Sequence, residues 1–204
     1  MFALETIKED MRKMKESQFF VKYFLPPATW YFYNEARQDE NKMNEMMEQF
    51  AEIVSVSLSV SSASIFIVGS AKLGYRLSPR KDDKLFRPFG NSSDFDIAIL
   101  SNRMFEYFWY QLRERQQTSA KIFFTDQYRC LASSIFRGFL NSFHIEVIDG
   151  VKTEWIQMFA DTTKKLQDNL GISHKISYRI YRHWEDFEQY QTNGIKTIKR
   201  IGGL

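Results

Sequence analysis

The chain has 204 residues, a formal net charge of +3 and a single cysteine, Cys130. This length suits one domain with a sizeable core, and an apolar content of 44% with 16% aromatic residues argues against disorder. We find no run of roughly 20 apolar residues that could span a bilayer, no signal peptide, and too few cysteines for a disulfide or a zinc cluster. We therefore expect a cytoplasmic protein, with too mild a charge to imply nucleic-acid binding by itself.

The first 60 residues are predicted to be mainly helical. Residues 3–17 place apolar side chains at helical spacing among charges, which predicts an amphipathic helix. Pro26 and Pro27 end any helix that reaches them. The aromatic cluster at 30–33 is expected to pack into the core. A second helix, with a broad methionine-rich apolar face, is predicted from about residue 39 to 58.

The middle of the chain is predicted to contain two strands. The apolar run 65–68 predicts a short buried strand, and Gly69 leads from it into a helix or turn. Residues 78–92 are predicted to form a polar loop, and 94–100 the second strand. A helix over 105–112 follows. Residues 122–124 suggest a strand, and 128–140 a helix.

The last third of the chain is predicted to add one strand and two helices. Residues 143–149 alternate over most of their length and predict a third strand. Helices are expected over 153–169 and 174–192, separated by Gly171. The order of elements favours an α+β core. We expect an N-terminal helical and aromatic segment over 1–38, a core over 39–152, and a C-terminal helical segment over 153–204 packed on the core.

Two carboxylates separated by one residue are the clearest chemical signal. On a strand, side chains alternate between faces, so Asp94 and Asp96 project from the same face. Two adjacent anions are costly unless they share a cation, and a divalent metal that serves phosphate chemistry is a common reason for such a pair. Gly69 lets backbone N–H groups approach a triphosphate, and Ser70 offers a hydroxyl to the same phosphates.

This arrangement resembles the nucleotidyltransferase superfamily of DNA polymerase β, especially its small bacterial members. The resemblance is carried by residues 67–75 and 93–97 and covers roughly 45–150. It implies a polymerase β-like core with a small mixed sheet and flanking N- and C-terminal helices. It also implies two Mg²⁺ or Mn²⁺ ions, held by Asp94, Asp96 and a third carboxylate on a neighbouring strand. The implied reaction moves a nucleoside monophosphate from an NTP or dNTP, such as ATP, to a hydroxyl.

We choose Glu146 as the third carboxylate, because apolar residues flank it as in the family pattern. Asp149, at the predicted strand end before a glycine, is the alternative, since Asp there commonly serves a turn. His144 shares the face of Glu146 and is more simply a structural histidine.

The nucleotide-binding residues are expected to be Gly69, Ser70, Lys72 and Arg76. The connection from Ser70 to Asp94 is longer than in the family, so residues 76–92 resemble an insertion. Its basic residues would bind the triphosphate or an acceptor, or simply form a surface loop: Arg76, Arg80, Lys81, Lys84 and Arg87.

The sequence leaves the acceptor open between a nucleic-acid end, a nucleotide and a protein side chain. Among small bacterial relatives, antiviral or toxin–antitoxin roles would fit. Tyr178, Tyr181 and Tyr190 on the predicted last helix offer protein hydroxyls, although their spacing is more simply that of a packed face. The alternative function is a catalytically weak nucleotide- or partner-binding module that retains the fold. The sequence does not specify the oligomeric state.

Overall fold

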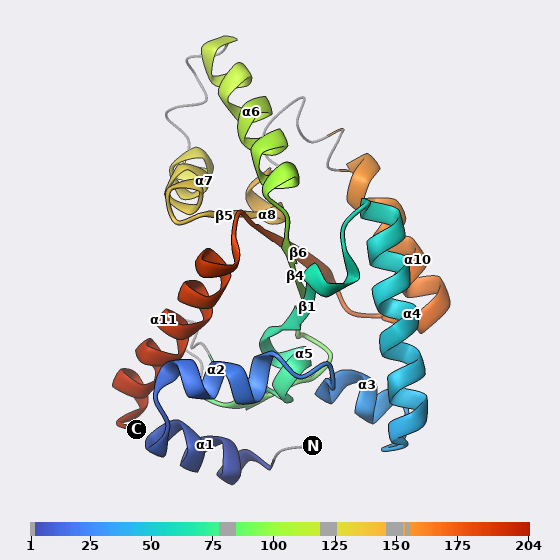
Figure 1. The fold of residues 1–204 in the computed structure, drawn as a ribbon, viewed down its shortest axis with the longest axis vertical. Helices are drawn as coiled ribbons and strands as arrows, with labels where there is room; N and C mark the ends of the chain where they lie inside the picture. Colours follow the sequence, from blue (N-terminus) through green and yellow to red (C-terminus); the bar gives the residue numbers. More distant parts are fainter. Residues whose placement is uncertain (1–2, 78–84, 119–125, 146–152, 154–155) are drawn as a thin grey trace.

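The computed structural model describes residues 3–77, 85–118, 126–145, 153 and 156–204. At its centre is a four-stranded mixed sheet in the order β1–β4–β6–β5 (Figure 1). The strands are β1 (Ile65–Val68), β4 (Phe95–Leu100), β5 (Phe139–Asn141) and β6 (Ile176–Tyr181). Strand β4 pairs antiparallel with β1 and parallel with β6, and β6 pairs antiparallel with β5. The predicted α+β class is confirmed.

One face of the sheet is covered by the helices α3 (Trp30–Glu35), α4 (Glu40–Leu58), α6 (Asn102–Thr118) and α10 (Asp161–Leu170). A π-helical turn (Ile156–Ala160) leads into α10. Figure 1 shows α4 and α10 side by side, and the two helices are in contact. Buried sheet residues on this face include Ile67, Phe95, Ile97, Tyr178 and Ile180.

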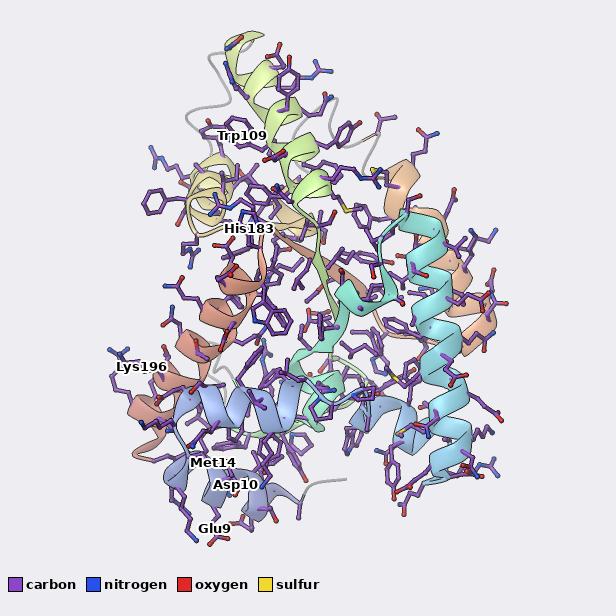
Figure 2. All side chains as sticks on the ribbon, in the orientation of Figure 1. Glu9, Asp10, Met14, Trp109, His183 and Lys196 are labelled. Atoms are coloured by element: carbon purple, nitrogen blue, oxygen red, sulfur yellow. The ribbon has the colours of Figure 1, made fainter. Side chains whose placement is uncertain are left out.

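The opposite face is covered by α1 (Leu4–Lys13), α2 (Glu16–Phe24) and α11 (Trp184–Gly202). Strand residues Val68, Ala98, Phe139 and Tyr181 are buried there with side chains from these helices. Helix α2 packs against α11. Asp10 of α1, near the lower end of the molecule in Figure 2, joins α1 to α2 by accepting hydrogen bonds from Lys22 and Tyr23.

The best-predicted elements have strong local signals. Helix α4 begins where the Asp39 side chain accepts hydrogen bonds from the backbone N–H groups of Asn41 and Lys42, as an N-cap does. It covers almost all of the predicted range 39–58. Strands β1 and β4 also lie where expected. The predicted helix over 3–17 is instead two helices, because α1 ends at Lys13 and α2 begins at Glu16.

Two predictions for the last third of the chain are wrong. The predicted strand over 143–149 begins as the short helix α8 (Ser142–Ile145), and residues 146–149 lie outside the described part. The predicted helix over 174–192 is divided between strand β6 and helix α11. The strand interpretation of 176–181 was missed because its aromatic residues and those of α11 together mimic helical spacing.

The segments on either side of β4 differ in part from their predicted structures. Helix α7 (Asp126–Phe136) ends earlier than predicted, and β5 follows it. A small hairpin is formed by β2 (Tyr75–Arg76), which precedes the predicted loop over 78–92, and β3 (Arg87–Pro88), which lies within it. Residues 78–84 and the predicted strand at 122–124 lie outside the described residues. No helix in the described part of the chain is long and apolar enough to cross a membrane.

The short helix α5 (Gly69–Leu73) connects β1 to this hairpin and ends at Gly74. Gly74 has a φ of +83°, and a Cβ added there would lie 2.4 Å from Cδ1 of the Trp30 indole. A rigid ring cannot yield as a flexible side chain can. Glycine is therefore required at this position on two independent grounds.

We predict that Gly74→Ala lowers the free energy of unfolding by about 1–3 kcal/mol, from backbone strain and the clash with Trp30. Gly194→Ala is the matched control, because nothing lies within 4 Å of its Cβ position. In the helix α11, that change should be neutral or stabilising by up to about 1 kcal/mol. Urea denaturation of both variants measures the difference. Equal stability of the two variants would contradict the prediction.

Candidate active-site cleft

A cleft of about 1020 Å³ lies on the α11 face of the sheet. Its walls come from the end of β1 and start of α5, the residues that lead into β4, strands β5 and β6, the α7–α8 region, and one side of α11. Five of the predicted site residues line this cleft: Gly69, Ser70, Arg76, Asp94 and Asp96.

Asp94 and Asp96 lie on the same side of the sheet, as predicted. Phe95 between them is fully buried in the core beneath the opposite face, whereas both aspartates are half-buried and line the cleft. The turn before Asp94 is fixed by hydrogen bonds. Ser93 N donates to Gly90 O at 2.8 Å. The carbonyl oxygen of Ser93 is 3.0 Å from His174 Nδ1.

The carboxylate of Asp96 is enclosed by the two neighbouring strands. In register, Asp96 faces Val68 of β1 and Ser177 of β6. The Ser177 hydroxyl donates a hydrogen bond to Asp96 Oδ1. On the other side, a Cβ added to Gly69 would lie 2.7 Å from Asp96 Oδ2, and Gly69 has a φ of +66°. Glycine is thus needed here to leave room for the carboxylate.

Burial raises the pKa of Asp96 above its usual value. The hydrogen bond from Ser177 and the positive charge of Arg179 act in the opposite direction, and the negative charge of Asp94 raises the pKa further. A bound cation would favour the charged form. A positively charged ligand at this site would therefore lower the pKa of Asp96 and stabilise its carboxylate.

Arg179 supplies positive charge on the sheet next to Asp96. Strand β6 places it two residues beyond Ser177 and so on the same face. Its guanidinium carbon lies 4.4 Å from the centroid of the Tyr190 ring and 5.5 Å from that of Phe139, which is cation–π geometry. Arg179 Nε and the Tyr181 hydroxyl are buried, and neither forms a hydrogen bond of ordinary geometry with a described residue. The two side chains nevertheless interact electrostatically.

Sequence reasoning missed Ser177 and Arg179, because it placed both on a helix. A signal was present. In residues 176–181, the mainly apolar side chains of Ile176, Tyr178 and Ile180 alternate with those of the residues between them, which include Ser177 and Arg179. This is the pattern of a strand with two distinct faces. The alternation of apolar residues with Ser177 and Arg179 would have placed these two side chains together.

Lys72 is not brought into the cleft, in contrast to its predicted role in nucleotide binding. It is buried, and its ammonium group donates hydrogen bonds to the carbonyl oxygens of Pro26 and Ala28, the latter at 2.9 Å. Lys72 therefore ties α5 to the connection between α2 and α3. Burial lowers its pKa to about 8.

Most of the other predicted site residues lie outside the part of the chain that the structure describes. Glu146 and Asp149 lie outside the described residues, as do Arg80, Lys81 and Lys84. Arg87 Nη2 donates to Ser92 Oγ at 2.8 Å. Within the described ranges, no three Asp, Glu, His or Cys side chains gather in a way that could hold a metal.

The three tyrosines considered as acceptors have different positions. Tyr178 and Tyr181 are buried in β6, and the Tyr178 hydroxyl is 2.9 Å from Thr163 Oγ1. Both are therefore packed residues, as the simpler interpretation held, but on a strand. Tyr190 lies on α11 and lines the cleft.

The buried Lys72 generates a pH prediction. The unfolded chain holds the lysine proton up to about pH 10.5, whereas the folded chain releases it near pH 8. Between these values the unfolded state binds more protons, so stability rises with pH, by on the order of 2–3 kcal/mol in total. Urea denaturation from pH 7.5 to 10 should show this rise in the native chain relative to Lys72→Met. An equal change of the free energy of unfolding with pH in the native chain and in Lys72→Met would contradict the prediction.

No protein-family model, no curated protein and no solved structure matches this chain. The chemistry of the cleft therefore rests on the residues described above.

Proposed function

We propose that this chain is a metal-dependent nucleotidyltransferase with a polymerase β-like core. It would transfer a nucleoside monophosphate from a nucleoside triphosphate to a hydroxyl group. The observation that supports this best is that Gly69, Ser70, Asp94 and Asp96 line a single cleft. The antiparallel pairing of the strand that precedes Gly69 with the strand that carries Asp96 fits the order of motifs on which the resemblance rests.

The size and charge of the cleft suit a nucleoside triphosphate. Its volume of about 1020 Å³ is at the upper end of the range for small-molecule sites, which leaves room for part of an acceptor. Arg76 and Arg179 line it together with the two aspartates. These guanidinium groups can bind phosphate oxygens with directed N–H donors.

The two aspartates fit one divalent cation such as Mg²⁺. Proteins commonly hold Mg²⁺ through one or two carboxylates, and substrate phosphates complete its coordination. When bound, the ion would neutralise charge on the triphosphate and on the pyrophosphate that leaves. A second ion would need a further carboxylate, which Glu146, or Asp149 as the alternative, would supply under the sequence-based hypothesis.

The reaction balances as a substitution at phosphorus. The acceptor oxygen forms a bond to the α-phosphorus, and the bond from the α-phosphorus to the oxygen that bridges to the β-phosphorus breaks. Pyrophosphate leaves, and the proton of the acceptor hydroxyl passes to a carboxylate, for which Glu146 is our choice. The role of Gly69 and Ser70 is to bind the phosphates in line with the acceptor.

One observation favours the second candidate, a nucleotide-binding module with weak or no activity. The resemblance implies a third carboxylate on a strand beside Asp96, but the strand seen there, β6, presents Ser177 and Arg179 to the cleft. Arg179 lowers the negative charge available to metal ions. Such a module would bind a nucleoside triphosphate without transferring any part of it.

We predict that Asp94→Asn and Asp96→Asn each reduce transfer by about 100-fold or more, because each removes a charge that holds the metal while keeping side-chain volume. Asp168→Asn, on the exposed side of α10, is the matched control and should leave the rate unchanged. Each labelled triphosphate is incubated with Mg²⁺ or Mn²⁺ and a panel of acceptors, and products are identified by mass spectrometry. Transfer that survives the double Asp→Asn change would refute the enzyme proposal, and binding without transfer would support the second candidate.

We also predict that Gly69→Ala weakens binding of the metal–triphosphate complex by at least about tenfold, because the new methyl group would displace the Asp96 carboxylate. Gly90→Ala is the control, since nothing lies within 4 Å of its Cβ position. Calorimetric titration with a non-hydrolysable triphosphate and Mg²⁺ measures the affinity, and circular dichroism establishes that both variants are folded. Unchanged affinity in folded Gly69→Ala would be evidence against phosphate binding at this turn.

A further inference from the structure

Two exposed aromatic rings line the cleft. Phe136, at the end of α7, is 91% exposed, and Phe143, in α8, is 57% exposed. Both line the cleft that contains Asp94 and Asp96. Burying a phenylalanine side chain is worth about 1.5–3 kcal/mol, so two rings left in solvent beside one site indicate that they contact a ligand.

One of the two rings has a cation over it, and the other is followed in sequence by an exposed arginine. Lys175 Nζ lies 5.3 Å from the centroid of the Phe143 ring. Arg137 directly follows Phe136 and places its guanidinium carbon 5.1 Å from the Phe139 ring. Both basic side chains are exposed and line the cleft. Two exposed rings and two exposed cations therefore line the same cleft.

The opposite wall is polar but mostly uncharged. Helix α11 contributes Gln189, Asn193 and Thr197 to the cleft, together with Tyr190, whose ring stacks on Arg179. These side chains offer hydrogen bonds without excluding an anion. Asp186 of α11 also lines the cleft, but its charge is offset by Arg182, whose Nε lies 3.3 Å from Asp186 Oδ2. Among the described residues that line the cleft, the other two carboxylates are Asp94 and Asp96, where a metal ion would offset the negative charge.

We propose that Phe136 and Phe143, with Arg137 and Lys175, form the acceptor subsite of the cleft and that the acceptor is a single-stranded nucleic acid. Every base has a flat π-face that stacks on an aromatic ring, while phosphates pair with nearby cations. The role of this strand as acceptor rests on the proposed function. Its binding does not, because stacking on the rings and pairing of phosphates with the cations require neither a metal ion nor transfer, although Lys175 lies next to Asp94 in the sheet.

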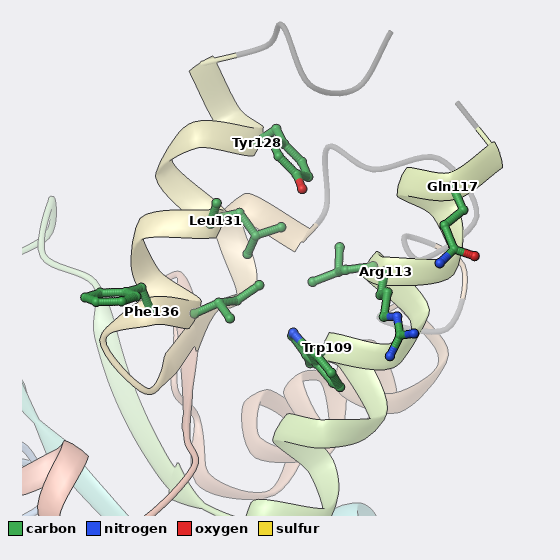
Figure 3. Close-up of a pocket in the computed structure, with 9 residues that line it drawn as sticks. Trp109, Arg113, Gln117, Tyr128, Leu131 and Phe136 are labelled. Carbon is green, nitrogen blue, oxygen red and sulfur yellow. The ribbon is translucent and has the colours of Figure 1, made fainter. Parts of the chain in front are cut away.

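A second pocket, of about 690 Å³, lies between α6 and α7 (Figure 3). It also pairs an exposed ring with a cation, since the Arg113 guanidinium carbon lies 5.7 Å from the centroid of the Trp109 ring, but neither Asp94 nor Asp96 lines it. Its apolar side chains face one another, with Trp109 and Arg113 at one side. Phe136 also borders it, but Figure 3 shows the ring on the outer side of α7, directed away from Trp109 and Arg113. The ring also lines the cleft that contains Asp94 and Asp96.

The test uses fluorescence anisotropy with fluorescein-labelled oligo(dT) and oligo(U) of about 12 nucleotides, a length that exceeds two stacking positions. The native chain should bind them, and a duplex of the same length should bind at least tenfold more weakly. Phe136→Ala combined with Phe143→Ala should weaken single-strand binding by on the order of 10–100-fold. Tyr110→Ala removes another exposed aromatic residue, outside the cleft, and should change nothing.

Charge is tested separately. Lys175→Gln should reduce the slope of log affinity against log salt by about 0.7, the value for one phosphate contact on a single strand. Absent binding, equal binding of the duplex, or full affinity in the double phenylalanine variant would each overturn the inference.

Failure of the inference is distinguishable from failure of the proposed function. Asp94→Asn should abolish transfer and leave oligonucleotide binding intact. If the native chain binds oligonucleotides through the two rings but transfers nothing, the subsite stands and the enzyme proposal falls. If intact-mass analysis instead finds the label on a protein, such as on Tyr190, with no oligonucleotide binding, the inference falls and the enzyme proposal stands.

Discussion

The carboxylate of Asp96 is held where three strands meet, and its surroundings constrain the rest of the site. A half-buried anion needs donors or cations nearby, because burial removes the water that would otherwise solvate it. Ser177 supplies a hydrogen bond and Arg179 a positive charge. Gly69 provides the space, since any larger residue would meet the carboxylate. The turn after β1, the start of β4 and the first half of β6 are therefore fixed relative to one another.

The parallel pairing of β4 with β6 carries this constraint across the chain. Parallel neighbours need a long crossover connection, and here the chain between them supplies α6, α7, β5, α8 and α10. Strand β6 thereby lies at the centre of the sheet rather than at its end. The segment after residue 152, expected to be a helical addition, instead contributes a central strand and the α11 wall of the cleft.

The distribution of charge matters more here than its total. A net charge of +3 gives no reason to expect an anionic partner. Within the described part of the cleft, however, four basic side chains lie on the walls with three aspartates, one of which, Asp186, is paired with Arg182. The four basic residues are Arg76, Arg137, Lys175 and Arg179. Positive groups near the aspartates suit a triphosphate, and those beside Phe136 and Phe143 suit the backbone of a strand. Both proposals depend on this local arrangement.

The predictable parts of the fold had signals that depend on neighbouring residues. Helix α4 combines a capping Asp39 with a long apolar face, and β1 and β4 are short apolar runs bounded by turn residues. The failures came where local signals conflicted. Residues 143–145 alternate as in a strand but form α8, and Tyr178 and Tyr181 match the helical spacing of Trp184 and Phe187 although they belong to β6.

By itself, the sequence determined that Asp94 and Asp96 share a face and that Gly69 leaves a buried strand, because both follow from the period of a strand and from the chemistry of glycine. Only the tertiary structure decided what lies beside them. Strand pairing brought Ser177 and Arg179 to Asp96, and packing turned Lys72 away toward the carbonyl groups of Pro26 and Ala28. Contacts between residues far apart in the sequence depend on register and packing, which no local pattern encodes.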